Sequence, residues 1–190
     1  MSKRVLFIKK GSFSNTNQSI INQLSQQFPD YQVEIFDLLH ILKSRNIFVF
    51  LMGVVHLVKD YGWDLVTGNK PLTEVRQLFF CTPFIFQSIK KIINEYVKGR
   101  ESTYIFSFQT QSYFDGSTDG LPHFIYTDHT MCTNYHYPYF NSKKYQRTHE
   151  YMVLEKQIYK NAASCFFMSE HVRNTISEFY DIPDKKAICV

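Results

Sequence analysis

The stretch Cys165-Phe166-Phe167-Met168-Ser169-Glu170-His171-Val172 decides the fold class, because it joins an apolar segment directly to the start of a helix. A short run of apolar residues is typical of a strand buried on both faces. Ser169 is a helix-capping residue type, and Val172, Ile176 and Phe179 repeat behind it at helical spacing. The segment therefore predicts a strand that leads straight into a helix, the repeating unit of a parallel α/β sheet.

The same alternation of strand and helix extends along the chain. Apolar or alternating segments predict strands, and apolar stripes at helical spacing predict helices between them. We expect an α/β protein with a Rossmann-like, doubly wound parallel sheet, covered by helices on both faces, in one domain spanning residues 1–190. The expected strands are 5–8, 31–35, 104–108, 124–127, 165–168 and 187–190, and the expected helices are 20–28, 37–66, 84–97, 151–162 and 172–179.

The composition is that of a folded globular chain. The 190 residues are 44% hydrophobic and 20% charged, which is enough apolar material for a packed core. Seven Gly and six Pro are too few for a disordered or collagen-like chain. The net charge of +4 is mild, and the Lys and Arg residues form no basic patch interleaved with aromatics. We therefore expect no nucleic-acid partner.

The cysteines and the N-terminus predict a cytoplasmic setting. Cys81, Cys132, Cys165 and Cys189 share no CxxC spacing, and most of them lie in apolar runs, as free buried thiols do. The apolar run that follows Met1-Ser2-Lys3-Arg4 is too short for a signal peptide. We expect a reducing, cytoplasmic environment.

The longest apolar stretch, Ile47 to Val58, is shorter than the roughly 20 residues that span a bilayer. A buried helix is the default interpretation. Lys43, Arg45 and Lys59 lie close to its ends. An amphipathic helix that contacts a membrane surface is therefore the alternative.

Candidate site residues follow from the topology that the pattern predicts. In open parallel sheets, ligands bind outside the carboxyl ends of the strands. Short polar segments follow several of the expected strands, so we expect them to gather along one rim of the sheet. The candidate substrate-binding and catalytic residues are Gly11, Ser12, Gln109, Gln111, Asp128, His129 and Ser169. Ser169 is also suited to a purely structural role as a helix cap.

The most specific of these features is Asp128-His129, which directly follows an expected strand. A histidine at such a rim can bind a sugar hydroxyl or a phosphate, or move a proton. A buried histidine satisfied by the backbone is the alternative, and the sequence leaves both open. His129, Cys132 and His136 have an irregular spacing for zinc, so we expect no metal.

Several common enzyme classes lack their motifs here. The chain contains no phosphate-binding P-loop and no G-x-S-x-G nucleophile elbow. It also contains no G-x-G-x-x-G motif, because the first turn carries the single glycine Gly11. A nucleotide-hydrolysing P-loop enzyme, an α/β-hydrolase and a dinucleotide-dependent dehydrogenase are therefore disfavoured.

Three stretches and the C-terminal run resemble a known family, the retaining glycosyltransferases of GT-B architecture that include sucrose and glycolipid glycosyl transferases. The chain is similar to their N-terminal half, the glycosyltransferase group 1 or subfamily-4-like N-terminal domain. The similarity covers about residues 100–190. The stretches that carry it are Phe124–Thr130, Glu155–Ala162, Cys165–Val172 and Phe179–Val190.

The resemblance implies a division of labour between two domains. It implies that this domain holds a sugar or lipid acceptor, and that a C-terminal domain absent from these 190 residues binds the nucleotide-sugar donor. This chain alone is then expected to bind no cofactor and to be an incomplete catalyst. His129, with Asp128 beside it, occupies the place of the family's rim histidine near the transferring sugar.

The Gly11-Ser12 turn occupies the place of the family's turn near the donor phosphates, although it is poorer in glycine. Two other functions stay open beside the transferase. One is a non-catalytic Rossmann-like module that binds a ligand. The other is an interaction domain at a membrane surface.

Overall fold

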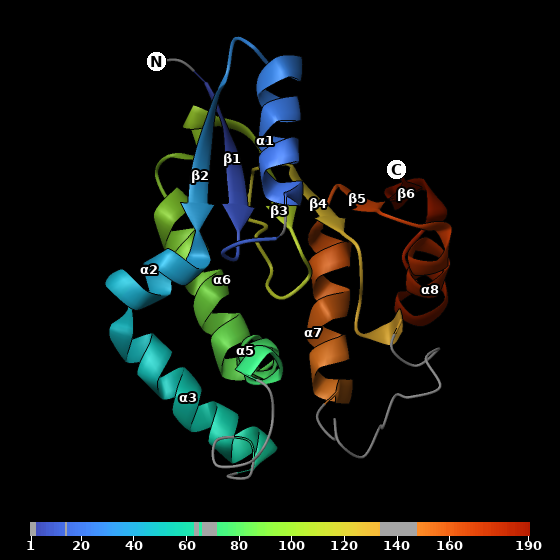
Figure 1. Cartoon of the computed structure of the whole chain (residues 1–190). Coiled ribbons are helices and arrows are strands. Elements are labelled where there is room, and N and C mark those ends of the chain that lie inside the picture. The colour runs from blue at the N-terminus through green and yellow to red at the C-terminus, as the bar shows by residue number, and fades with distance from the viewer. Residues whose placement is uncertain (1–2, 14, 63–64, 66–71, 134–147) are drawn as a thin grey trace.

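The computed structural model of the protein describes residues 3–13, 15–62, 65, 72–133 and 148–190 (Figure 1). Six strands form one sheet in the order β2-β1-β3-β4-β5-β6, and all neighbouring pairs are parallel. The predicted α/β class with a Rossmann-like, doubly wound parallel sheet is confirmed. The strands are β1 (Arg4–Lys9), β2 (Gln32–Asp37), β3 (Tyr104–Thr110), β4 (His123–Thr127), β5 (Ser164–Phe167) and β6 (Ala187–Cys189).

The helices follow the predicted stripes, with two differences. The region predicted as one helix over 37–66 forms two helices, because the N–H groups of Arg45 and Asn46 both donate to the Ile41 carbonyl, which ends the first helix, and the chain bends by 103° before the second begins. Residues 72–80 form a helix that the sequence did not predict. The helices are α1 (Thr16–Gln27), α2 (Leu38–Ser44), α3 (Ile47–Tyr61), α5 (Leu72–Phe80), α6 (Pro83–Val97), α7 (Thr148–Asn161) and α8 (Glu170–Tyr180).

The two faces of the sheet carry different layers (Figure 1). Alternate residues of β1 point to opposite faces: Leu6 and Ile8 join the core formed with α2, α3, α5 and α6, whereas Val5 and Phe7 pack toward α1. On the first face the core continues under α7 and α8. On the second face, Phe108 and Phe166 line a groove of about 690 Å³ beside α1. Among the described helices, α1 covers this face only in part.

The strand order places a topological switch point at β1. The chain leaves β1 for β2 on one side and returns to β3 on the other. Connections diverge there, which leaves a crevice at the carboxyl ends of the strands. This crevice is where a ligand site is expected in such a sheet.

The cysteines are free thiols, as predicted, and Cys81, Cys132 and Cys165 are buried. Within the described ranges, no individual helix is both long and apolar enough to cross a bilayer. The bent pair α2 and α3 reaches the necessary length and composition only when the two helices are counted together.

Gly53 sets how closely α3 approaches its neighbours. A Cβ atom at this position would lie 2.7 Å from Cε2 of Phe79 in α5, and closer still to Cδ1 of Ile85 in α6. Both neighbouring side chains are buried in the main core. The absence of a side chain at Gly53 therefore lets three helices meet.

We expect Gly53→Ala to lower the free energy of unfolding by about 1–2 kcal/mol, because the overpacking cost exceeds the gain in helix propensity. Denaturant unfolding measures it. The same substitution should cost less in an Ile85→Val background, which lacks the Cδ1 atom that the new methyl group would meet. A Gly53→Ala protein as stable as the wild type would contradict this account of the helix contact.

Candidate functional site

A cavity of about 420 Å³ opens at the carboxyl ends of β3 and β4. Its walls come from the segments that follow β1, β3 and β4, and from α5 and α7. The cavity is therefore built at the sheet edge that the topology selects. Its volume lies within the range of about 300–1,000 Å³ that is usual for small-molecule sites.

Asp128 and His129 line the cavity directly after β4. Thr127 holds this turn, since its hydroxyl donates to the His129 carbonyl at 2.7 Å and accepts from the His129 N–H at 3.4 Å. The Asp128 side chain is exposed and His129 is half-buried. Both residues are thus presented at the mouth of the cavity rather than packed in the core.

Gln111 lines the cavity from the end of β3. Its backbone is left-handed, with φ of 69°, and its N–H donates to the Tyr126 carbonyl at 2.9 Å. A non-glycine residue in this region is uncommon and is seen at functional turns. The Gln111 Oε1 atom is buried and has no hydrogen-bond partner among the described residues. A ligand hydroxyl or N–H could supply the missing donor.

Gln109 is fully buried, and its side chain hydrogen-bonds to the backbone of the segment that follows β3. Its Nε2 donates to the carbonyls of Gln111 and Phe114, both at 2.7 Å, and its Oε1 accepts from the Gly116 N–H at 2.8 Å. The side chain does not line the cavity. Gln109 positions Gln111 through these hydrogen bonds.

Glu155 of α7 is the buried charge of the site. Its Oε1 accepts from the Ser112 hydroxyl at 2.7 Å and from the Tyr159 hydroxyl at 3.2 Å. Its Oε2 accepts from the Met131 N–H at 2.9 Å and from the Tyr180 hydroxyl at 2.5 Å. Burial raises the pKa of Glu155, and the same hydrogen bonds oppose that rise. The carboxyl group joins the loops after β3 and β4 to α7 and α8.

Lys10 lies beside the cavity, at the end of β1. Its Nζ is 3.5 Å from the centroid of the Tyr113 ring and 4.6 Å from that of Phe80. Burial lowers the pKa of Lys10 to about 8, and the nearby Cys81 acts in the opposite direction. The preceding residue, Lys9, instead pairs with Asp37 at 2.8 Å.

The remaining candidates lie outside the cavity. Gly11 lines a separate shallow hollow beside α2, and its N–H donates to Asp37 at 3.2 Å. Ser12 is exposed and is not part of the cavity wall. Ser169 caps α8 by accepting the Val172 N–H at 3.4 Å. The cavity wall therefore contains Gln111, Asp128 and His129, whereas Gly11, Ser12, Gln109 and Ser169 do not line it.

Sequence reasoning missed several residues of the cavity wall. Glu155 carried a detectable signal, because it lies on the same helical stripe as Tyr151, Ile158 and Ala162, where an apolar residue is expected. Lys10, which lies beside the wall, carried no sequence signal that distinguishes it from Lys9. The contributions of Gln77 and Leu78 from α5, and of Cys81 directly after it, could not be anticipated because the helix itself was not predicted.

Within the described part of the chain, no group of three or more His, Cys, Asp or Glu side chains is arranged to hold a metal ion. His136, one of the three residues considered for zinc, lies outside the described residues. In comparisons with known proteins, no family model and no curated protein matches the chain.

Glu155→Gln should lower the free energy of unfolding by about 2–4 kcal/mol, because the amide NH₂ would face hydroxyl and N–H donors that need an acceptor. Chemical denaturation measures this loss. Tyr180→Phe, which removes one donor, should cost about 1 kcal/mol. Glu178→Gln, at an exposed position of α8, is the matched control. A Glu155→Gln protein as stable as this control would show that the hydrogen bonds to Glu155 do not hold the site together.

Lys10→Met should change how stability depends on pH. Between pH 8 and 10.5 the unfolded chain holds a proton on Lys10 that the folded chain has lost. Wild-type stability should therefore rise across this window relative to Lys10→Met, by about 2–4 kcal/mol. Unfolding curves at several pH values measure the difference. Lys91→Met, whose site is exposed, is the control. Parallel curves for wild type and Lys10→Met would contradict the burial of the Lys10 charge.

Proposed function

We propose that this chain is the acceptor-side domain of a glycosyltransferase, an enzyme that transfers a sugar from a nucleotide-sugar to an acceptor hydroxyl. One observation carries the proposal. The cavity at the carboxyl ends of β3 and β4 combines Asp128 and His129 at its mouth with the unpartnered, buried Oε1 atom of Gln111.

The chemistry of this wall suits a polyhydroxyl ligand. A sugar hydroxyl can donate to the Gln111 carbonyl oxygen or to the Asp128 carboxylate. The His129 imidazole can donate or accept, according to its tautomer. Phe13, Tyr113 and Tyr151 also line the cavity and offer apolar surface to the C–H groups of a sugar ring. The wall therefore combines polar groups with aromatic surface, and its polar share suits a ligand rich in hydroxyl groups.

Two of the four stretches that resemble the glycosyltransferase family lie on elements that build the cavity, and the other two lie on β5, α8 and β6, outside its wall. Phe124–Thr130 forms β4 and the turn that carries His129, and Glu155–Ala162 belongs to α7. The position of these two stretches at the cavity supports the proposed function, whereas the fold class, which many unrelated functions share, does not by itself favour it.

In the proposed mechanism, His129 contacts the transferring sugar and Asp128 orients the acceptor or His129. Sugar transfer requires the donor and the attacking hydroxyl to be held in line and shielded from water. The cavity provides one wall of such a site. We therefore propose that a second, C-terminal domain supplies the nucleotide-sugar and closes over this wall.

His129→Ala should weaken saccharide binding at least tenfold while leaving the fold intact, because the substitution removes a hydrogen-bonding group at the cavity mouth. Saturation-transfer NMR of the 190-residue chain with glucose, mannose and galactose measures binding, and circular dichroism measures the fold. His40→Ala is the matched control, since His40 is an exposed histidine of α2 outside the cavity.

No saccharide binding by the wild type, or equal binding by the wild type and His129→Ala, would contradict the proposal. A transfer assay with UDP-glucose and GDP-mannose tests the division of labour. We expect the chain alone to give no turnover, and ordinary turnover would show that a second domain is not needed. Saccharide binding without transfer, even when the second domain is supplied, would instead favour a non-catalytic binding module.

A further inference from the structure

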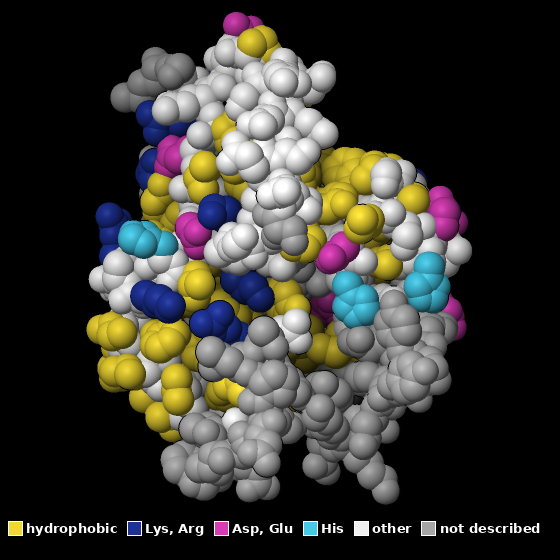
Figure 2. All heavy atoms as spheres, viewed as in Figure 1, with side chains coloured by type: hydrophobic (Ala, Val, Ile, Leu, Met, Phe, Trp, Pro, Cys, Tyr) yellow, Lys and Arg dark blue, Asp and Glu magenta, His cyan; other side chains and the backbone are white. Residues whose placement is uncertain are grey.

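The outer face of α3 carries a continuous apolar stripe. Ile47, Leu51 and Val55 follow one another at intervals of four residues, and Phe48 lies beside them. Their side chains are exposed by 55% at Ile47, 56% at Leu51, 56% at Val55 and 72% at Phe48. Figure 2 shows hydrophobic side chains gathered over α3, on the lower left of the molecule. An apolar patch that is contiguous, rather than scattered, marks an interaction surface.

Packing of the opposite face prevents α3 from turning this stripe inward. Gly53 and Leu57 are buried against the core, and the Phe50 ring lies 5.3 Å from that of Phe79 in α5. The His56 ring stacks on Phe84 of α6 at 4.3 Å. The exposed stripe is therefore a fixed feature of the folded chain.

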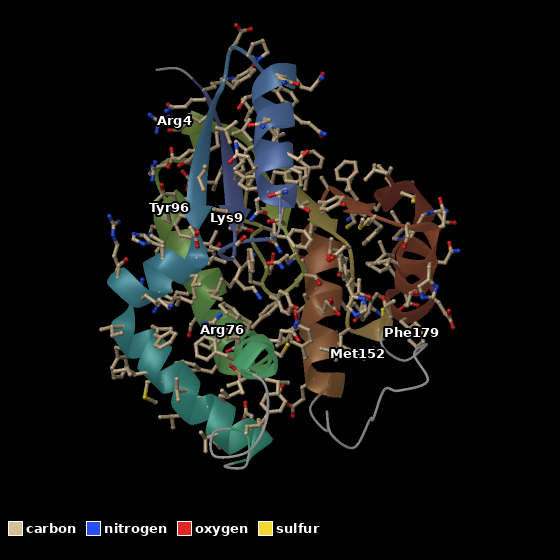
Figure 3. All side chains as sticks on the ribbon, in the orientation of Figure 1. Arg4, Lys9, Arg76, Tyr96, Met152 and Phe179 are labelled. Atoms are coloured by element: carbon tan, nitrogen blue, oxygen red, sulfur yellow. The ribbon has the colours of Figure 1, made fainter. Side chains whose placement is uncertain are left out.

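Cations flank the stripe. Lys43 and Arg45 are exposed just before α3 begins, and Lys59 is exposed at the position that continues the four-residue repeat. The acidic residue of α2 and α3 is Asp60, whose helical position faces away from the stripe. Arg76, labelled in Figure 3, is also exposed, but it lies on α5, which packs against the opposite face of α3, so it does not flank the stripe.

We propose that α3 docks lengthwise on a lipid bilayer that contains anionic lipids. The apolar stripe would enter the boundary between headgroups and acyl chains, and the flanking Lys and Arg side chains would reach the lipid phosphates. The helix has 15 residues and a length of about 22 Å, which is shorter than the roughly 30 Å hydrocarbon core. It therefore lies on the surface and does not span the bilayer. The exposed cations Lys43, Arg45 and Lys59 beside the stripe favour an anionic membrane surface over an uncharged apolar partner.

The docking surface and the cavity share one wall. α5 packs against α3 and also provides Gln77 and Leu78 to the cavity. When α3 is docked on the bilayer, α5 therefore lies between α3 and the cavity. The docking proposal does not depend on the proposed sugar transfer, because it rests on the surface of α3 alone.

Co-sedimentation with large unilamellar vesicles tests the proposal. The 190-residue chain is mixed with phosphatidylcholine vesicles, or with vesicles in which about a third of the lipid is phosphatidylglycerol. We expect binding to the anionic vesicles at 0.1 M NaCl, at least tenfold weaker binding to the neutral ones, and weaker binding at 0.5 M NaCl. Phe48→Ser/Leu51→Ser should reduce the partition coefficient on anionic vesicles at least tenfold.

Val153→Ser/Met168→Ser is the matched control, because Val153 and Met168 are exposed by 50% and 62% and lie outside α3. It should bind like the wild type. Lys43→Glu/Arg45→Glu should remove the preference for anionic vesicles. The proposal fails if the wild type does not sediment, if it binds neutral and anionic vesicles equally, or if Phe48→Ser/Leu51→Ser binds like the wild type. It also fails if light scattering shows a dimer that Phe48→Ser/Leu51→Ser dissociates, because the stripe would then be covered by a second copy.

Discussion

The buried carboxyl group of Glu155 holds the candidate site together. It accepts hydrogen bonds from Ser112, which follows β3, from the Met131 backbone, which follows β4, and from Tyr159 of α7 and Tyr180 of α8. Removing a carboxylate from water is costly, and hydrogen bonds to both oxygens are what offset that cost. Glu155 therefore links the loops that carry Gln111 and His129, in addition to the hydrogen bond from the Gln111 N–H to the Tyr126 carbonyl.

The topology explains why such a group is needed. Parallel strands deliver their polar ends to one edge, but the segments that leave β3 and β4 run beyond the last paired residues, Thr110 and Tyr126, and are irregular. Buried polar networks with every member satisfied can fix such irregular backbone. Glu155 fixes the loops from the α7 side, and Gln109 does the same from within β3.

The cavity and the outer face of α3 lie on opposite sides of one layer of helices, formed by α3, α5 and α6. α5 and α6 separate the sheet from α3, and the close contact at Gly53 couples these helices. The inner surface of this layer closes the cavity, and its outer surface remains apolar and flanked by cations. If both proposals hold, a ligand that is itself anchored in a bilayer would meet the cavity at the height of the membrane surface.

The sequence by itself determined the class of fold and the edge of the sheet at which the polar segments after the strands lie. Periods of two and 3.6 residues report which face of each element is buried, and this is why all six strands and most helices were predicted. The same reasoning placed Gln111, Asp128 and His129 at the rim. Periodicity carries no information about which loops become neighbours, so only the tertiary structure decided that Gly11 and Ser169 lie apart from the cavity. It also decided that α5 closes the cavity, that Glu155 is buried and that Lys10 is half-buried, because these depend on contacts between segments far apart in the chain.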